Sequence, residues 1–333
     1  MKQIAKYFFY QIICPLLLFF GLDKFLRGRS SNRRLIIMYH GVSKKENFSI
    51  NGRHLPSAEF QKHLRYFKKH FDILSLTELC NLREDNKSRY SIAITFDDGY
   101  LNNVQNAVPL LSKYEIPATF FISTIGLTNE EYIHPSDYID VIRKSTTESL
   151  EINGMHFHHK NGDFLTNSGM NLFSYINSLS FEEFRHTLST LQNKFPKKNI
   201  LKGIDRELYS LVSSDTMMDF LSTKLFNVGS HSHEHVNLST LSIEELDHQV
   251  GISKRFLDST LQTPVNSIAF PYGYFNEDVL DRSSKNGYQY MLAGGSVSDK
   301  WRGRVFPRIG ILNMAGYAFN MLSVNRGFRN FGF

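Results

Sequence analysis

The chain has 333 residues, 41% of them hydrophobic and 21% charged, which is the composition of an ordered globular protein with one large domain or two small ones. The formal net charge is only +6, and Lys and Arg are scattered without a nucleic-acid-binding motif, so we expect no DNA or RNA partner. The two cysteines, Cys14 and Cys80, lie far apart in sequence, so we expect no structural disulfide.

Residues 1–34 are hydrophobic, with basic residues on both sides of the apolar part. The uncharged run from Tyr7 to Leu22 is shorter than the about 20 apolar residues of a membrane-spanning helix, and it contains Gln11 and Pro15. No small-residue cleavage site follows, which argues against a cleaved signal peptide. Because basic residues are denser after the run, the positive-inside tendency favours placing the rest of the chain on the cytoplasmic side. We predict membrane association through an interfacial or short-spanning anchor; an uncleaved anchor with the chain outside, and a buried helix, are the alternatives.

The first predicted strand covers residues 35–41, a buried apolar run that ends in Tyr39, His40 and a glycine. A histidine at the end of a strand is more often a hydrogen-bonded structural residue than a catalyst. Residues 56–69 then have the pattern of an amphipathic helix, for which Ser57 is the expected N-cap.

The most informative stretch is residues 91–96, an apolar and β-branched run that ends in Asp97, Asp98 and Gly99. We predict a buried strand with a sharp turn at the glycine, and this end of a strand is where parallel α/β folds collect binding groups. Adjacent residues of an extended chain point to opposite faces, so the two carboxylates should have different partners. Alone, an Asp-Asp-Gly sequence is more typical of a solvated turn.

A helix at residues 102–114 and a strand at residues 116–122 are predicted next. A strand, a helix and a second strand at this spacing indicate a parallel sheet or barrel.

Residues 126–205 interrupt this alternation. They contain a predicted hairpin at residues 150–157, with Asn153 and Gly154 at its turn, and a helix at residues 181–195. The hairpin carries three histidines, His156, His158 and His159. Because strand alternation divides them between two faces, we expect no second metal site there. We expect this segment to influence the choice of substrate rather than the chemistry.

Two histidines, His231 and His235, follow another apolar run and lie four residues apart. One helical or turn-like step would place both imidazoles on the same side. With one carboxylate they form a set of two nitrogens and one oxygen, the composition of catalytic zinc sites that leave positions open for water. His233 lies between them and should face away from both.

A third strand, at residues 267–270, ends in the turn Pro271-Tyr272-Gly273. The remaining predicted elements are a helix at residues 242–261 that begins with a capping box of Ser242 and Glu245, a helix at residues 277–286, and strands at residues 288–293 and 304–310.

The three strand ends together resemble the motifs of the polysaccharide deacetylases, the NodB-homology group of carbohydrate esterase family 4. The matching sequences are Thr95-Phe96-Asp97-Asp98-Gly99 for the first motif, His231-Ser232-x-x-His235 for the second, and Pro271-Tyr272-Gly273 for the end of the third. The strand that ends in Tyr39-His40 is similar to the branch that acts on poly-N-acetylglucosamine. The resemblance covers roughly residues 35–311.

This resemblance implies an α/β fold, a distorted (β/α)7-type barrel of parallel strands with outer helices. It divides the chain into an anchor-like segment at residues 1–34, a deacetylase domain at residues 35–312 with its insertion at residues 126–205, and a tail at residues 313–333. The implied activity is hydrolysis of N-acetyl groups on an N-acetylated glycan.

The resemblance also implies roles for individual residues. Asp98, His231 and His235 would hold a divalent metal, with zinc as the expected ion, and Asp97 would be the catalytic base. The backbone N–H of Tyr272 would be an oxyanion donor. A protonated group must give its proton to the departing amine, and His40 is the candidate for this general acid.

Two positions depart from the family pattern. Better-known members have an arginine two residues before the third-motif proline, where it holds the catalytic aspartate, and this position is Ala269 here. We expect Arg308 to supply the guanidinium instead. The late histidine that serves as the acid in many members also has no counterpart, since no histidine follows His248.

Two other functions fit the same residues. The site could hydrolyse an O-acetyl ester or another amide, because the same metal, base and oxyanion donor would serve. The chain could instead be a pseudoenzyme that binds a glycan without turnover, although the intact set of metal and base residues argues against this.

Overall fold

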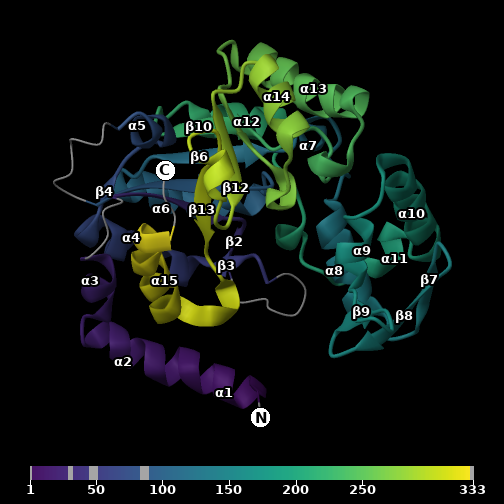
Figure 1. Ribbon diagram of the computed structural model, residues 1–333, viewed down its shortest axis with the longest axis horizontal. Helices are drawn as coiled ribbons and strands as arrows, with labels where there is room; N and C mark the ends of the chain where they lie inside the picture. The colour runs from purple at the N-terminus through teal and green to yellow at the C-terminus, as the bar shows by residue number, and fades with distance from the viewer. Residues whose placement is uncertain (1, 29–32, 45–51, 83–89, 331–333) are drawn as a thin grey trace.

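Seven parallel strands pair side by side until the last pairs with the first, which closes them into a barrel surrounded by helices (Figure 1). The computed structural model describes residues 2–28, 33–44, 52–82 and 90–330. In order around the barrel the strands are β1 (Arg34–Tyr39), β13 (Phe306–Gly310), β12 (Tyr290–Gly294), β11 (Ser267–Ala269), β10 (Phe226–Ser230), β6 (Ala118–Ile122) and β5 (Ser91–Phe96). The predicted (β/α)7-type barrel is confirmed.

The length over which neighbouring strands pair varies around the barrel. β1 and β5 pair along their whole length, from Arg34 opposite Ser91 to Tyr39 opposite Phe96. A short extra strand, β4 (Asp72–Ile73), pairs with the beginning of β5. By contrast, β10 and β11 meet at one residue pair. The carboxyl ends of β10 and β11, which carry the second and third motifs, are therefore held mainly by their other neighbours.

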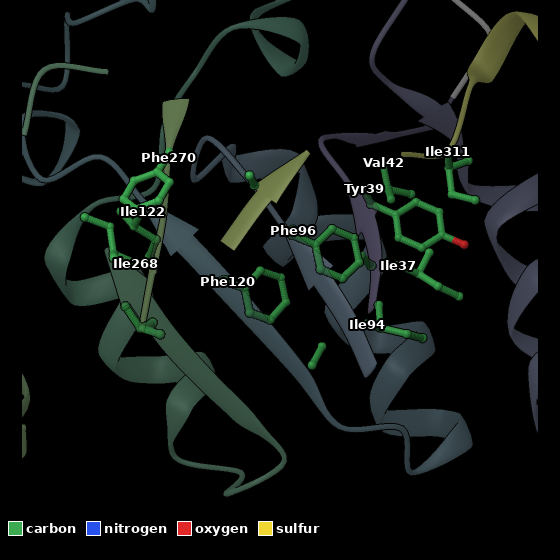
Figure 2. Packing of buried hydrophobic residues seen from close by; sticks show 14 of the residues in the cluster. Ile37, Tyr39, Val42, Ile94, Phe96, Phe120, Ile122, Ile268, Phe270 and Ile311 are labelled. Carbon is green, nitrogen blue, oxygen red and sulfur yellow. The ribbon is translucent and has the colours of Figure 1, made fainter. Parts of the chain in front are cut away.

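Alternation along the strands produces two apolar layers. The smaller cluster contains Ile36, Ala93, Phe121, Ala269 and Leu292 and is covered by α5 (Leu76–Cys80). On the opposite face of the strands, Phe96 stacks between Tyr39 and Phe120, with ring centroids 5.4 and 4.9 Å apart (Figure 2). Aromatic side chains thus fill the space beneath the outer helices, while the first cluster combines aliphatic residues with Phe121 and two alanines.

The outer helices follow the strands in sequence. They include α4 (Ser57–His70), α6 (Val108–Tyr114) after a π-helical turn η2 (Asn103–Ala107), α12 (Ser214–Leu221), α13 (Ile243–Leu261), α14 (Glu277–Lys285) and α15 (Gly316–Asn330). The predicted capping box of Ser242 and Glu245 is confirmed at α13. The predicted N-cap Ser57 is wrong: Pro56, which ends β3 (Leu55–Pro56) in an extended conformation, is the capping position, so Ser57 is already helical.

The interrupting segment forms a separate group of elements beside the barrel (Figure 1). It consists of α7 (Ile125–Thr128), α8 (Pro135–Ser145), β7 (Leu150–Ile152), β8 (Met155–Lys160), β9 (Asp163–Leu165), α9 (Leu172–Ile176), α10 (Phe181–Lys194) and α11 (Lys197–Ile200). The predicted hairpin is confirmed, and Asn153 and Gly154 have the positive φ values of 51° and 74° that its turn requires.

The beginning and the end of the described chain lie together. α1 (Lys2–Phe8), η1 (Phe9–Ile13), α2 (Cys14–Phe19) and α3 (Leu22–Arg27) run beside α15 (Figure 1). α15 buries Met321, Val324 and Phe328 in the main apolar core. Within the described residues, no helix combines the length and the apolar character needed to cross a membrane.

Candidate metal centre and catalytic cavity

Three predicted ligands converge at the carboxyl ends of the strands. Asp98 follows β5, and His231 and His235 follow β10. Oδ1 of Asp98 lies 3.3 Å from Nε2 of His231 and 3.0 Å from Nε2 of His235. All three side chains are buried, and their potential ligand atoms lie within 4.8 Å of one another. His233 is not part of this group: its Nδ1 lies 2.9 Å from Oγ1 of Thr124, as expected for a residue that faces away.

The backbone that carries the ligands is held in an uncommon conformation. Asp98 and His235 have positive φ values of 73° and 54°. Such conformations are costly outside glycine and are kept where the surroundings impose them, often at functional sites. Here His134 is one such constraint, because its Nε2 donates to the carbonyl oxygen of Asp98 over 2.8 Å. Oγ of Ser232 accepts from the N–H of His235 over 3.2 Å.

The second ring nitrogens of the two histidines also have partners. Nδ1 of His231 donates to the carbonyl oxygen of Ala269 over 2.8 Å. The proton is therefore on Nδ1, and Nε2, which faces Asp98, carries the lone pair that a metal could use. Nδ1 of His235 lies 3.2 Å from the hydroxyl of Tyr272. This fixed orientation fits a divalent metal, because both Nε2 atoms can act as ligands without turning the rings.

The charge of the group also suits a cation. Burial would raise the pKa of Asp98, but the adjacent His235 and His231 outweigh burial and hold it well below its ordinary value. Asp98 is therefore a carboxylate at neutral pH. Two imidazole nitrogens and a carboxylate oxygen are donors that zinc accepts in catalytic sites.

Asp97 has a different partner from Asp98 and pairs with Arg308 of β13. Nη1 and Nη2 of Arg308 donate to the two carboxylate oxygens over 2.6 and 2.7 Å. Burial would raise the pKa of Asp97, but the guanidinium of Arg308 and the imidazole of His231 lower it below its ordinary value. The different partners predicted for the two adjacent aspartates are thus found, and so is the predicted contact of Arg308.

Small residues make room for this buried arginine. Arg308 is fully buried, and its guanidinium lies 5.3 Å from the centre of the Phe121 ring. Ala93 and Ala269 belong to the apolar cluster around that ring, and Oγ1 of Thr95 accepts a further bond from Arg308 over 3.3 Å. Ala269, where the resemblance to the family predicted an arginine in other members, is on β11, whereas the guanidinium here reaches the aspartate from β13.

The three predicted ligands and the Asp97–Arg308 pair line one cavity of about 410 Å³. His40 lies in its wall, half-buried at the end of β1. Burial lowers the pKa of His40 below its ordinary value, and the carboxylates of Asp98 and Asp97 work against that effect. A lowered pKa reduces the protonated fraction of the imidazole at neutral pH, so the two carboxylates are what would keep a proton on His40 for the departing amine.

Tyr272 forms part of the same wall. It lies in the short 3₁₀ turn η5 (Pro271–Gly273) and has a positive φ of 59°. Gly273 has no alternative there, because a Cβ would lie 3.2 Å from the carbonyl oxygen of Gly294 and φ is 74°. The turn presents Tyr272 to the cavity, and the role of its N–H as an oxyanion donor stays a prediction.

Several residues of the site were not predicted from the sequence. Arg53, Ser136 and Phe173 line the cavity, and His134 holds Asp98. Nη2 of Arg53 lies 2.5 Å from Oδ1 of Asp137, at the beginning of α8. None of these residues belongs to a motif, so nothing local in the sequence indicated them. His134, Ser136 and Phe173 come from the inserted segment, as does Asp137, the partner of Arg53, so the segment forms part of the site.

Comparisons with known proteins point to one family. A family model described as polysaccharide deacetylase matches residues 84–193 and 210–291, more than half of the chain. The poly-beta-1,6-N-acetyl-D-glucosamine N-deacetylase of Staphylococcus aureus (strain MSSA476) is 24% identical over 278 residues, which cover 82% of this chain and 70% of that protein. The Bacillus subtilis (strain 168) protein YxkH is 35% identical over 129 residues, but the match spans only 36% of this chain and 44% of that relative.

Two solved structures share the fold. The Streptococcus pyogenes deacetylase PplD, in complex with acetate, has a TM-score of 0.56 at 16% identity, and the match covers 87% of this chain and 96% of PplD. IcaB from Ammonifex degensii also has a TM-score of 0.56, at 14% identity over 89% of this chain and 97% of IcaB. At these identities the likeness shows the fold alone.

Proposed function

The chain belongs to the polysaccharide deacetylase family and is a hydrolase of carbon–nitrogen bonds, and from this premise we propose that it removes N-acetyl groups from a poly-N-acetylglucosamine-like glycan with the help of a divalent metal, zinc being the expected ion. The observation that carries the proposal is the convergence of Asp98, His231 and His235 beside the Asp97–Arg308 pair. The relative with 24% identity supports the class of substrate.

The metal would be held by the carboxylate of Asp98 and by Nε2 of His231 and His235. When bound, a divalent metal acts as a Lewis acid that activates water and polarises the acetyl carbonyl. The protein must then supply a base, a donor for the oxyanion and an acid, because an amide carbonyl resists attack by neutral water.

Asp97 would accept the proton of the attacking water. It is anionic because Arg308 lowers its pKa, and the paired guanidinium fixes its orientation. Tyr272 lines the cavity, and its backbone N–H would donate to the developing oxyanion. His40, which follows β1, would give a proton to the nitrogen as the carbon–nitrogen bond breaks.

The test is acetate release from N-acetylglucosamine oligomers by metal-stripped protein, zinc-restored protein and Asp97→Asn. We expect release only with metal, and a loss of at least about 10²-fold in Asp97→Asn, because it removes the general base. Asp219→Asn, an exposed aspartate on α12, is the matched control and should retain full activity.

The other outcomes distinguish the alternative functions. Release from O-acetylated but not N-acetylated oligomers would replace the proposal with an esterase. Zinc bound at the three ligands without release from either substrate would favour a glycan-binding role. Absence of metal binding, measured by elemental analysis of the stripped and reloaded protein, would contradict the metal centre itself.

A further inference from the structure

The chain begins with a helical rod whose outward side is apolar. Phe8 and Ile13 keep right-handed helical φ and ψ, so α1, η1 and α2 continue into one another, and we call residues 2–19 the N-terminal rod. The rod lies along α15 at one edge of the molecule (Figure 1). It therefore has one side against the protein and one side free of it.

The inward side of the rod is packed. Cys14 is buried together with Ala318 and Leu322 of α15, and Tyr10 and Leu17 pack around them. The rings of Tyr10 and Phe319 lie 4.8 Å apart. These contacts bury the residues that lie at helical spacing along the inward side of the rod.

The outward side carries large apolar residues at the same spacing. The exposed fractions are 53% for Phe8, 46% for Ile12, 49% for Leu16 and 82% for Phe19. Tyr7, Phe9 and Phe20 are exposed beside them. Single exposed apolar residues are common, but a continuous stripe of this kind marks an interaction surface.

The chemistry of the stripe identifies its partner. From Tyr7 to Leu22 the chain has no charged residue, whereas the exposed Lys6 and Lys24 stand just outside the two ends. A protein interface would surround its apolar centre with a polar rim, whereas between Tyr7 and Phe19 the exposed side chains are apolar or aromatic except for Gln11. Apolar and aromatic residues with cations at the margin instead match a helix lying in the interface of an anionic bilayer.

The rod also lies close to the catalytic cavity. Leu312 lines the cavity and is 54% exposed, and Met314 of the turn η7 (Asn313–Ala315) is 66% exposed. α15 begins directly after this turn at Gly316, where an added Cβ would lie 3.6 Å from Nε2 of Gln11. Two exposed apolar residues, Leu312 and Met314, therefore lie in the chain between the cavity and the start of α15, where α15 meets Gln11 of the rod.

We propose that the outward side of the N-terminal rod binds an anionic lipid bilayer and thereby holds the cavity mouth beside the membrane, where it acts on glycan chains attached to or leaving that surface. The second half of this statement rests on the proposed deacetylase function; the first half does not. The rod lies on the membrane and does not cross it.

Vesicle flotation of the full chain tests the first half. Wild type should float with vesicles of phosphatidylcholine and phosphatidylglycerol, and less with phosphatidylcholine alone. The triple variant Phe8→Ser, Ile12→Ser, Phe19→Ser should lose more than about tenfold in partitioning, since each of these side chains would leave an apolar environment. The matched control is Met170→Ser, Met218→Ser, Ile243→Ser, which changes three exposed apolar residues elsewhere and should bind like wild type.

Three results would overturn the membrane surface. In the first, wild type stays with the aqueous phase. In the second, the Phe8, Ile12, Phe19 variant floats as well as wild type. In the third, light scattering shows that wild type is a dimer and that the Phe8, Ile12, Phe19 variant, but not the control variant, is a monomer. The last result would identify a second copy of the chain as the partner. Unchanged circular dichroism of both triple variants shows that they are folded.

Activity on two forms of one substrate tests the second half. An acetylated oligosaccharide is offered free in solution and attached to a lipid in the same vesicles, and the ratio of acetate release from the two forms is compared. In wild type the ratio should favour the attached form, and in the Phe8→Ser, Ile12→Ser, Phe19→Ser variant it should fall at least tenfold. Acetate release from the free form should be equal in the two proteins. An equal ratio in both proteins would overturn the second half; no release from either form, with vesicle binding intact, would remove the deacetylase function alone.

Discussion

The pair of Asp97 and Arg308 illustrates what a single residue contributes to this site. Both side chains are buried, so each would be costly to bury without the other. The two parallel hydrogen bonds also fix the direction in which the aspartate can accept a proton. Arg308 thus acts through Asp97 and is a positioning residue.

Replacing Arg308 by methionine should reduce both stability and turnover. The loss of one partner leaves Asp97 buried without its counter-charge, which costs about 3–5 kcal/mol in the free energy of unfolding. Arg304→Met is the matched control, because Arg304 pairs with Glu277 and Asp281 at the surface and should cost no more than about 1 kcal/mol. Urea unfolding followed by circular dichroism measures both.

Acetate release adds a second readout for this position. Arg308→Lys keeps the charge but loses the paired geometry, so it should lie between wild type and Arg308→Met in kcat. Equal urea midpoints for Arg308→Met and Arg304→Met would show that the pair contributes nothing to stability.

Among the elements, the inserted segment has the largest effect on the site. α8 begins beside Asp98: His134 precedes it, and Asp137 in its first turn binds Arg53 of the cavity wall. α9 carries Phe173, whose ring lies 5.3 Å from that of Tyr272 in an edge-on arrangement. Substrate choice was the predicted task of this segment, and the structure adds a hydrogen bond from His134 to Asp98, one of the three predicted metal ligands.

His134→Ala should weaken metal binding. The hydrogen bond to the Asp98 carbonyl stabilises the left-handed backbone of that ligand, and loss of such an outer partner lowers metal affinity by about 10–100-fold. Titration calorimetry with zinc measures the affinity directly. His134→Gln, which retains an N–H donor, should recover part of it, and His156→Ala on the exposed face of β8 should have no effect. The same zinc affinity for His134→Ala and wild type would refute this role.

Phe173→Ala should lower kcat/KM for oligomers more than for a small acetylated monomer. An aromatic contact of this kind contributes about 0.5–1.5 kcal/mol, which corresponds to a loss of about twofold to tenfold. Phe181→Ala is the control within the same segment, because that ring packs on α10 and does not line the cavity. Equal losses for the monomer and the oligomer would mean that Phe173 does not contact the extended glycan.

At the scale of the whole molecule, the first helices are joined to the barrel through α3. Asp23 of α3 is buried and accepts a hydrogen bond from the hydroxyl of Tyr66 on α4. Nδ2 of Asn325, on α15, donates to the same hydroxyl over 2.9 Å. Three helices from distant parts of the chain therefore meet at one polar group, which joins α3, directly after the N-terminal rod, to α4 and α15.

Asp23→Ala should destabilise this junction. It leaves the buried Tyr66 hydroxyl without its acceptor, which costs about 1–3 kcal/mol. Asp219→Ala on the exposed side of α12 is the control and should change stability by less than about 0.5 kcal/mol. Thermal unfolding checks the difference, and limited proteolysis should cleave near α3 earlier in Asp23→Ala. Identical unfolding curves for the two variants would contradict this account of the junction.

The sequence by itself determined the features that depend on neighbouring residues. Strand alternation assigned Asp97 and Asp98 to different partners, and turn chemistry located the hairpin at Asn153 and Gly154. These succeed because backbone preference and side-chain direction are set within a few residues. The family motifs extended this local information to the barrel.

Only the tertiary structure decided which distant residues meet. It brought His134, Arg53 and Phe173 to the cavity, and it set which side of the N-terminal rod packs on α15. It also placed Pro56, rather than Ser57, at the start of α4. The physical reason is that such contacts depend on how the barrel closes and on where an inserted segment folds back, and neither is encoded in any short stretch of the chain.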